Sequence, residues 1–325
     1  MSFGLRNATQ TFQRFIDEVL RHLDFCYAYI DNVLVASASE EDHEQHLCIY
    51  FQRFNEYGVL LNAAKCVFGV TEVTFLGYTM SAAGTRPLEE KVTTINLFQK
   101  PVFVKDLRRF LGMLTFYRRF TPQAASIQAP LHAALASPKI KGSQPLDWTR
   151  AMVQAFEGCK ASLSHATLLA HPDPSAALAL FTDAYDTAIG AALKQRVCDA
   201  WQPLSFYSHK LSSTQQKYSP YDRELLAVYE AIKYFRHMVE GCDFVIFTDH
   251  KPLTYAFQQR RAKFSPQQFR HLEFIGQFYT DFRHVLGQDN VVADALSTAK
   301  SVTAHLDYSA LASSQDQDAE LQDVL

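Results

Sequence analysis

The chain has 325 residues, of which 48% are hydrophobic and 20% are charged, and its formal net charge is −3. This composition excludes an intrinsically disordered chain and predicts a folded protein of about two domains. The near-neutral charge also excludes a strongly basic nucleic-acid-binding protein, so any surface for nucleic acid must be local.

The spacing of the cysteines and the length of the apolar runs indicate the cellular compartment. The 6 cysteines are far apart, with no Cys-x-x-Cys pair, which argues against a zinc finger and favours reduced thiols. We find no signal peptide and no apolar run long enough to cross a bilayer. The sequence therefore predicts a cytoplasmic or nuclear protein with no membrane partner, and it leaves the oligomeric state open.

Residues 1–84 mix helical and strand patterns. Apolar residues at helical spacing predict a helix over residues 12–20, and Gly58 is a typical stop for a second helix. The further pattern predicts a hairpin with strands Phe25–Ala28 and Val33–Ala36 around the turn Tyr29-Ile30-Asp31-Asn32, a helix from about Glu40 to Tyr57, and two more short strands near Val73–Met80 and the Ala83-Gly84 turn.

Residues 85–130 are helical in pattern and basic. The predicted helix Val104–Phe120 interleaves aromatic residues with Lys105, Arg108, Arg109, Arg118 and Arg119. Periodicity alone favours an amphipathic helix with solvated charges, and phosphate contact is the alternative. Residues 136–147 contain Ser137-Pro138, Gly142 and Pro145, which indicates a linker.

The rest of the chain alternates strand and helix patterns. The predicted elements are a helix Trp148–Leu163, three strands up to Tyr207 of which the first is Leu178–Thr182, a helix containing Glu224, a strand Phe244–Thr248, helices around Leu253–Phe257 and Pro266–Phe278, a strand near Phe282–Val285, and a last short helix. Mixed strands with helices on both sides predict an α/β fold.

Four acidic residues in this region occupy the ends of predicted elements. Asp183 and Asp249 each follow an apolar run that suits a buried strand. Glu224 lies in the first turn of a helix that Ser219-Pro220 would begin. Asp294 is expected in the first turn of the last short helix. Acids at the ends of separate elements are typical of a converging metal site.

The chemistry of phosphodiester hydrolysis explains why four acids matter. Two Mg²⁺ ions roughly 3.5–4 Å apart activate a water and stabilise the leaving oxygen, and they need several hard oxygen ligands. Each acid taken alone is more typical of a turn or of a helix N-terminus. The set of four, in the order strand, helix, strand, helix, favours a site for two Mg²⁺ ions, with Mn²⁺ as the alternative ion.

The motifs that carry these acids are Thr182-Asp183-Ala184, Asp222–Ala227, Phe247–Leu253 and Asn290–Ser297. Together they closely resemble the RNase H domain of gypsy-type LTR-retrotransposon Pol polyproteins. The resemblance implies an RNase H-like mixed sheet with flanking helices. It also implies cleavage of the RNA strand of RNA–DNA hybrids, with Mg²⁺ held by Asp183, Glu224, Asp249 and Asp294.

The N-terminal pieces resemble the reverse transcriptase of the same family, from Phe3-Gly4-Leu5 onward. Tyr29-Ile30-Asp31-Asn32 matches its Tyr-x-Asp-Asp turn, but neutral Asn32 stands where the second carboxylate is usual. The family's third polymerase carboxylate lies upstream of this match. We therefore expect Asp31 and Asn32 to be a remnant without RNA-directed DNA polymerase activity.

The resemblance divides the chain into five parts. They are a truncated α+β palm (residues 1–84), a thumb-like helical region (85–135), a linker (136–147), an RNase H domain (148–300) and an acidic tail like the linker before an integrase (301–325). Basic or polar groups predicted to touch the hybrid are Arg108, Arg109, Lys210, Arg223, His250 and Lys251. The alternative function is a non-catalytic retrotransposon relic or a nucleic-acid-binding fragment.

Overall fold

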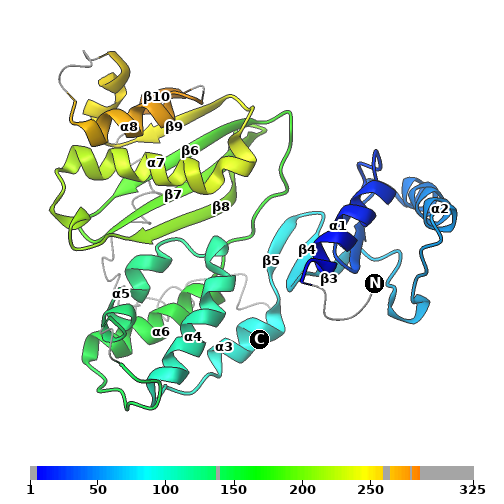
Figure 1. Ribbon diagram of the computed structural model, residues 1–325, viewed down its shortest axis with the longest axis horizontal. Helices are drawn as coiled ribbons and strands as arrows, with labels where there is room; N and C mark the ends of the chain where they lie inside the picture. Colours follow the sequence, from blue (N-terminus) through cyan, green and yellow to red (C-terminus); the bar gives the residue numbers. More distant parts are fainter. Residues whose placement is uncertain (1–5, 137–139, 259–263, 279, 286–325) are drawn as a thin grey trace, which may run out of the picture.

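The computed structural model describes residues 6–136, 140–258, 264–278 and 280–285. Figure 1 shows an N-terminal part set to one side, a group of helices below, and a five-stranded sheet above them. The predicted architecture, an α/β sheet preceded by a palm-like and a helical region, is confirmed. The last predicted helix and the acidic tail lie outside the described residues.

The N-terminal part consists of two helices and a hairpin. α1 (Ala8–Val19) and α2 (Glu40–Glu56) flank β1 (Cys26–Tyr29) and β2 (Asn32–Val35), as the sequence predicts. The hydroxyl of Ser39 caps α2 by accepting from the Asp42 amide. A small core of buried residues joins the helices to the hairpin: Ile16, Val19, Leu20, Leu23, Tyr50 and Phe54.

A three-stranded antiparallel sheet follows, after a short 3-10 turn η1 (Ala63–Lys65). Its strands are β3 (Glu72–Phe75), β4 (Tyr78–Ser81) and β5 (Gly84–Pro87). The prediction of only two strands and of helix from residue 85 was wrong. β5 pairs with β4 in an antiparallel hairpin, and Thr85 also exchanges backbone hydrogen bonds with Leu169, at 2.7 and 3.0 Å, across a long stretch of sequence.

The helical group contains α3 (Glu89–Asn96), α4 (Val104–Phe116), η2 (Arg118–Phe120), α5 (Ala124–Ala134) and α6 (Arg150–Ser164). The predicted helix 104–120 ends early and continues as a 3-10 turn. The predicted linker is held against the start of α4, because carbonyls of Gly142 and Gln144 accept from the amides of Lys105 and Val104. These amides are donors that a helix N-terminus leaves without intrahelical partners.

The large sheet has the strand order β10-β9-β6-β7-β8. β6 (Ala177–Ala184), β7 (Ala188–Val197) and β8 (Ala200–Lys210) are antiparallel neighbours. β9 (Phe244–Thr248) and β10 (Thr280–His284) continue the sheet in parallel with β6. The remaining elements are η3 (Gln215–Lys217), α7 (Pro220–Val239), η4 (Lys251–Gln258) and α8 (Pro266–Ile275).

Each face of this sheet is packed against a different set of helices. On one face, Leu180, Leu193 and Ile246 belong to one buried cluster with residues of α7 and α8. On the other face, Phe181 and Phe206 belong to a cluster with residues of α4, α5 and α6. The helical group therefore completes the second face of the sheet, below β8 in Figure 1.

Within the described parts of the chain, none of the helices has the length and apolar character needed to cross a membrane.

Candidate metal centre

Parallel pairing brings the first two acids together. Phe181 of β6 pairs with Phe247 of β9. Asp183 and Asp249 each lie two residues further along, so they share a sheet edge and a face. Thr182 and Thr248, the residues before them, are fully buried. The two aspartates therefore stand at the adjoining ends of two buried strands, as the sequence predicts.

Glu224 reaches the same edge from α7. The hydroxyl of Ser219 caps this helix by accepting from the Asp222 amide, and Pro220 is its first residue. This start confirms the sequence prediction and places Glu224 near the helix N-terminus. The Ala184 amide at the end of β6 donates a hydrogen bond of 3.0 Å to Oε1 of Glu224. The helix and the strand are thus joined beside Asp183.

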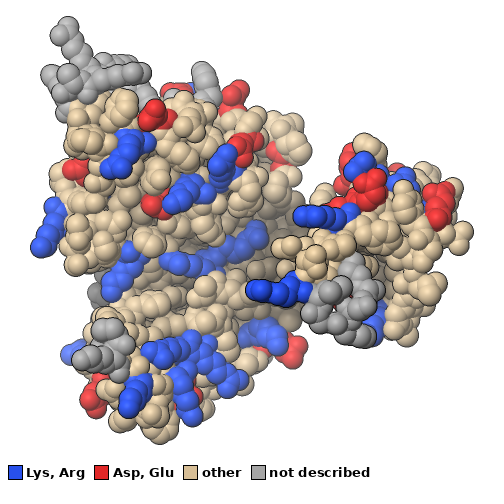
Figure 2. All heavy atoms as spheres, in the orientation of Figure 1, with Lys and Arg blue, Asp and Glu red and all other residues tan. Residues whose placement is uncertain are grey.

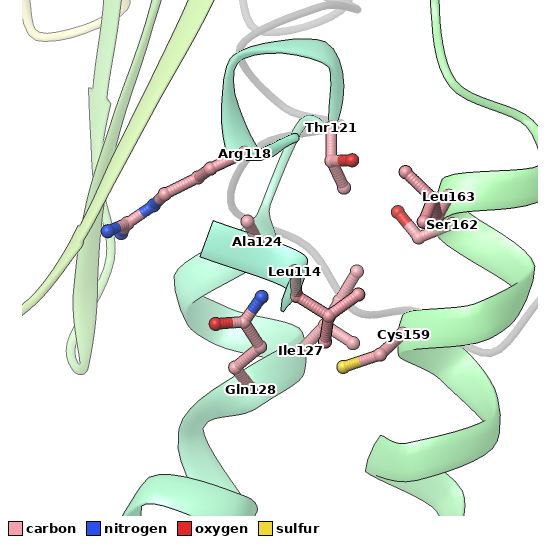
Figure 3. A pocket seen from close by; sticks show the side chains of 9 residues that line it. All are labelled: Leu114, Arg118, Thr121, Ala124, Ile127, Gln128, Cys159, Ser162 and Leu163. Carbon is pink, nitrogen blue, oxygen red and sulfur yellow. The ribbon is translucent and has the colours of Figure 1, made fainter. Parts of the chain in front are cut away.

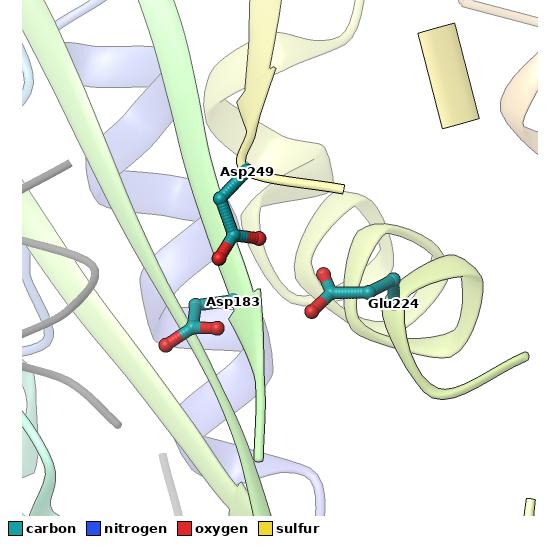
Figure 4. Close-up of side chains that lie close together, drawn as sticks. All are labelled: Asp183, Glu224 and Asp249. Atoms are coloured by element: carbon teal, nitrogen blue, oxygen red, sulfur yellow. The ribbon is translucent and has the colours of Figure 1, made fainter. Parts of the chain in front are cut away.

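The three acids form one compact cluster. One carboxylate oxygen from each of Asp183, Glu224 and Asp249 can be chosen so that all three lie within 4.8 Å of one another. Figure 4 shows the two aspartates extending from neighbouring strands and Glu224 facing them from the helix. Asp183 and Glu224 are buried, at 6% and 5% exposure, and Asp249 is half-buried.

The electrostatics of the cluster fit a divalent cation. Burial first, and then the charges of Asp183 and Asp249, raise the pKa of Glu224 well above its usual value. Its Oε2 is buried and has no hydrogen-bond partner among the described residues. Carboxylate oxygens are the ligands that Mg²⁺ prefers, and a bound cation would offset the repulsion. The residues present therefore fit a metal ion.

The other predicted residues near the cluster have different environments. Asp294 lies outside the described residues. Arg223 forms an ion pair with exposed Asp186. His250 is half-buried, with its ring against Tyr221, whereas Lys251 is exposed. His284 on β10 contacts the Asp249 carbonyl through Nε2 at 3.0 Å, and no local sequence pattern could show that contact.

The basic residues of the helical group separate into two kinds. Arg108 and Arg109 are exposed on α4, and Arg108 makes only a 3.4 Å contact with the Ile140 carbonyl. Arg118 instead turns toward the sheet and donates to the Ser208 carbonyl on β8. Lys210 is half-buried at the end of the same strand.

The polymerase-like turn is well defined but exposed. Gln13 of α1 supports it, since its Oε1 accepts from the Ile30 amide at 2.7 Å and its Nε2 donates to the Ala28 carbonyl. Asp31 and Asn32 are both exposed at the tip. Within the described residues, Asp31 belongs to no cluster of three metal-ligating side chains.

A β6–β7–β8 meander, a following helix and a parallel strand, with acids at their adjoining ends, define the RNase H-like class of folds. Family comparison agrees with this class. Residues 148–246 match the family described as "RNase H-like domain found in reverse transcriptase", and residues 1–80 match "Reverse transcriptase (RNA-dependent DNA polymerase)".

Similar proteins identify the family. The Tf2-7 transposon polyprotein of Schizosaccharomyces pombe is 33% identical over 302 residues, which are 91% of this chain and 22% of that protein. The retrovirus-related Pol polyprotein from transposon 297 of Drosophila melanogaster is 35% identical over 309 residues, or 94% of this chain and 28% of that protein. The chain belongs to the Pol polyproteins of LTR retrotransposons and spans under a third of these relatives' length.

Solved structures support the same fold. A foamy viral protease-reverse transcriptase in complex with double-stranded DNA matches with a TM-score of 0.75 and 19% identity, covering 88% of this chain and 60% of that chain. The same kind of protein in complex with an RNA/DNA hybrid matches with a TM-score of 0.75 and 20% identity, covering 88% of this chain and 39% of the other.

Proposed function

We propose that this protein is a ribonuclease H that cleaves the RNA strand of RNA–DNA hybrids. The observation that carries the proposal is the convergence of Asp183, Glu224 and Asp249 at one edge of an RNase H-like sheet. Structural ion-pair networks also gather acids, but two of these three carboxylates are buried, and Arg223, whose charge acts on Glu224, forms its ion pair with exposed Asp186 instead. Such a cluster is a candidate for catalysis.

The residues present would hold two Mg²⁺ ions, with Mn²⁺ as the alternative, and Asp294 would complete the ligand set. Bound metal would supply an activated water and charge stabilisation for the leaving oxygen. Asp183 and Asp249 would hold the ions from fixed strand ends. Glu224 would keep its orientation because its Oε1 accepts from the Ala184 amide. The 2′-hydroxyl would distinguish RNA from DNA.

We further propose that the Asp31–Asn32 turn does not support polymerase chemistry. A two-metal polymerase needs charged oxygen ligands, and the Asn32 amide is neutral. In the structure the side-chain amide of Asn32 donates a hydrogen bond of 3.3 Å to an Asp31 carboxylate oxygen. Primer extension on an RNA template by the full chain is the test, and we expect no extended product. Extension with added Mg²⁺ would show that Asn32 is compatible with synthesis.

Cleavage of a labelled RNA–DNA hybrid by the full chain in Mg²⁺ tests the ribonuclease proposal. We expect cleavage of the RNA strand and its loss in Asp249→Asn. The matched control is Asp243→Asn, because Asp243 is exposed and directly precedes β9, at the opposite end of the strand that Asp249 follows. This control should cleave normally.

Two results would contradict the ribonuclease proposal. One is an intact hybrid after incubation with folded protein and Mg²⁺. The other is equal cleavage by the parent and by Asp249→Asn, which would indicate a contaminating nuclease. Circular dichroism of each variant establishes that the comparison is made between folded proteins.

A further inference from the structure

The sheet register places Ser208 of β8 in the same cross-strand row as Asp183 of the carboxylate cluster. Asp183 pairs with Gly190, and Gly190 pairs with Ser208. Cross-strand partners point to the same face of a sheet, so Ser208 lies in the row of Asp183, two strands away. Neighbouring strands lie about 4.8 Å apart, which gives about 10 Å between the two positions.

Ser208 is also the point where the helical group is attached to β8. Its carbonyl accepts from the guanidinium of Arg118, and its hydroxyl accepts from the Ala125 amide at 3.0 Å. Figure 3 shows Arg118 extending away from the other side chains around a small cavity and toward the neighbouring strand. The start of α5 is therefore held beside the row that contains Asp183.

This attachment gathers basic side chains. Arg118, His132 of α5 and Lys210 of β8 form what we call the α5–β8 basic cluster. Helix α5 packs against β8, which carries Lys210, and the pKa of His132 is lowered first by burial and then by the charges of Lys210 and Arg118. Lys210 makes no ion pair with any residue that the structure describes. Figure 2 shows lysine and arginine side chains along the hollow between the sheet and the helices.

We propose that the α5–β8 basic cluster binds a backbone phosphate of the RNA–DNA hybrid whose RNA strand lies at the carboxylate cluster. The inference rests on the proposed ribonuclease function and extends its substrate site. Lys210 is two residues beyond Ser208 on β8, so its Cα lies about 12 Å from that of Asp183 by strand geometry. One strand of a duplex carries a phosphate about every 3.4 Å of axis, so the contact lies three or four steps from the cleaved bond.

Each side chain has a distinct part in this contact. Lys210 supplies a positive charge with no described ion-pair partner. Arg118 joins the helical group to β8 through the Ser208 carbonyl, and its guanidinium adds a second positive charge. Nε2 of His132 lies 3.4 Å from Oε1 of Gln128 in a part-buried contact. With its pKa lowered, His132 is mostly neutral near pH 7, so Lys210 is the residue to change.

The test measures binding of a short labelled hybrid to the full chain in metal-free buffer, at several salt concentrations, where cleavage does not interfere. Lys210→Gln should weaken binding several-fold and reduce the slope of log affinity against log salt by about one, as expected for one lost phosphate contact. Lys210→Arg should retain the slope. The matched control is Lys91→Gln, which removes an exposed charge from α3.

The outcomes separate this inference from the ribonuclease proposal. If Lys210→Gln and Lys91→Gln have the same slope and affinity while the parent still cleaves, the phosphate contact is refuted and the ribonuclease stands. If the slope falls only in Lys210→Gln but the parent does not cleave in Mg²⁺, the contact stands and the ribonuclease is refuted. Thermal melting of both variants establishes that each is folded.

Discussion

The Ala184 amide donates a hydrogen bond of 3.0 Å to Oε1 of Glu224, which joins the end of β6 to the first turns of α7. This bond occupies one carboxylate oxygen of Glu224, and the other is buried without a described hydrogen-bond partner. Glu224 is therefore oriented by the backbone, while burial and the two neighbouring aspartates outweigh the effect of Arg223 and raise its pKa. A cation is the simplest group that would stabilise this arrangement.

Removing that charge should make folding less dependent on metal. Glu224→Gln keeps an acceptor for the Ala184 amide but relieves the repulsion from Asp183 and Asp249. We expect the variant to resist urea better than the parent in metal-free buffer. Mg²⁺ should stabilise the parent clearly and the variant little, because stabilisation follows binding to the folded state. If neither Mg²⁺ nor Mn²⁺ changed the urea midpoint of the parent protein, the proposed metal centre would be contradicted.

Lys194 offers a test of pH dependence. Burial lowers its pKa from 10.5 to about 8. Since the folded pKa lies below the unfolded one, the charged lysine destabilises the fold below about pH 8, and this penalty fades as the pH rises toward 10.5. The shift corresponds to at most about 3 kcal/mol, and the Phe181 ring 4.3 Å from Nζ offsets part of it.

Lys194→Met should therefore raise the free energy of unfolding by about 1–2 kcal/mol near neutral pH. The difference from the parent should shrink at about pH 10, where the lysine is increasingly neutral in both states. Urea titrations at the two pH values measure it. Lys91→Met, at an exposed position, should show no comparable pH-dependent gain; equal behaviour of the two variants would argue against a buried charge at Lys194.

A glycine at the start of β5 should be intolerant of any side chain. Gly84 has a φ of +138°, and an added Cβ would lie 2.2 Å from the Leu169 carbonyl oxygen. Gly84→Ala should lower the free energy of unfolding by about 2–4 kcal/mol, since a backbone atom cannot easily move away. Gly112→Ala in α4 meets nothing within 4 Å and should be neutral or stabilising by up to about 1 kcal/mol. Calorimetry of both variants gives the comparison.

The attachment of α5 to β8 should be measurable through one hydroxyl. Ser208→Ala leaves the buried Ala125 amide without its acceptor, which should cost about 1–2 kcal/mol in unfolding free energy. Ser205→Ala is the matched control, because Ser205 is buried on the same strand and its hydroxyl makes no hydrogen bond within the described structure. Equal losses in both variants would mean that the Ala125 bond contributes nothing.

Local patterns predicted the elements whose signals are local. Phe244–Thr248 is the strand that its apolar run indicates, and the Ser219-Pro220 start of α7 follows from capping and proline preferences. Strand β5 was missed because its Gly84 and Pro87 are poor strand formers, and it forms by antiparallel pairing with β4 and a bridge to Leu169. The predicted helix 104–120 ends at Phe116 and is followed by a 3-10 turn, from which the Arg118 side chain contacts the Ser208 carbonyl of β8, a contact that no local pattern indicates.

The acidic residues of the candidate site could be predicted from the sequence, but the backbone contacts and sheet register that position them could not. Asp183, Glu224 and Asp249 were identified from their positions at the ends of elements and from motif resemblance, and the structure brings these three together. The Ala184 amide and the row that links Asp183 to Ser208 depend on sheet register. Register is fixed by tertiary packing, and no single segment of sequence contains it.

Helices α4, α5 and α6 pack on one face of the sheet, and this packing restricts where related retrotransposons can exchange segments by recombination. A recombination crossover at residue 148, where the RNase H-like family match begins, would leave α4 and α5 behind and expose Phe181 and Phe206 to solvent. A crossover upstream of β5 would transfer the sheet together with its covering helices and the Thr85–Leu169 pairing. A segment that keeps the sheet covered after such an exchange therefore begins near residue 84, just after the reverse-transcriptase match ends at residue 80.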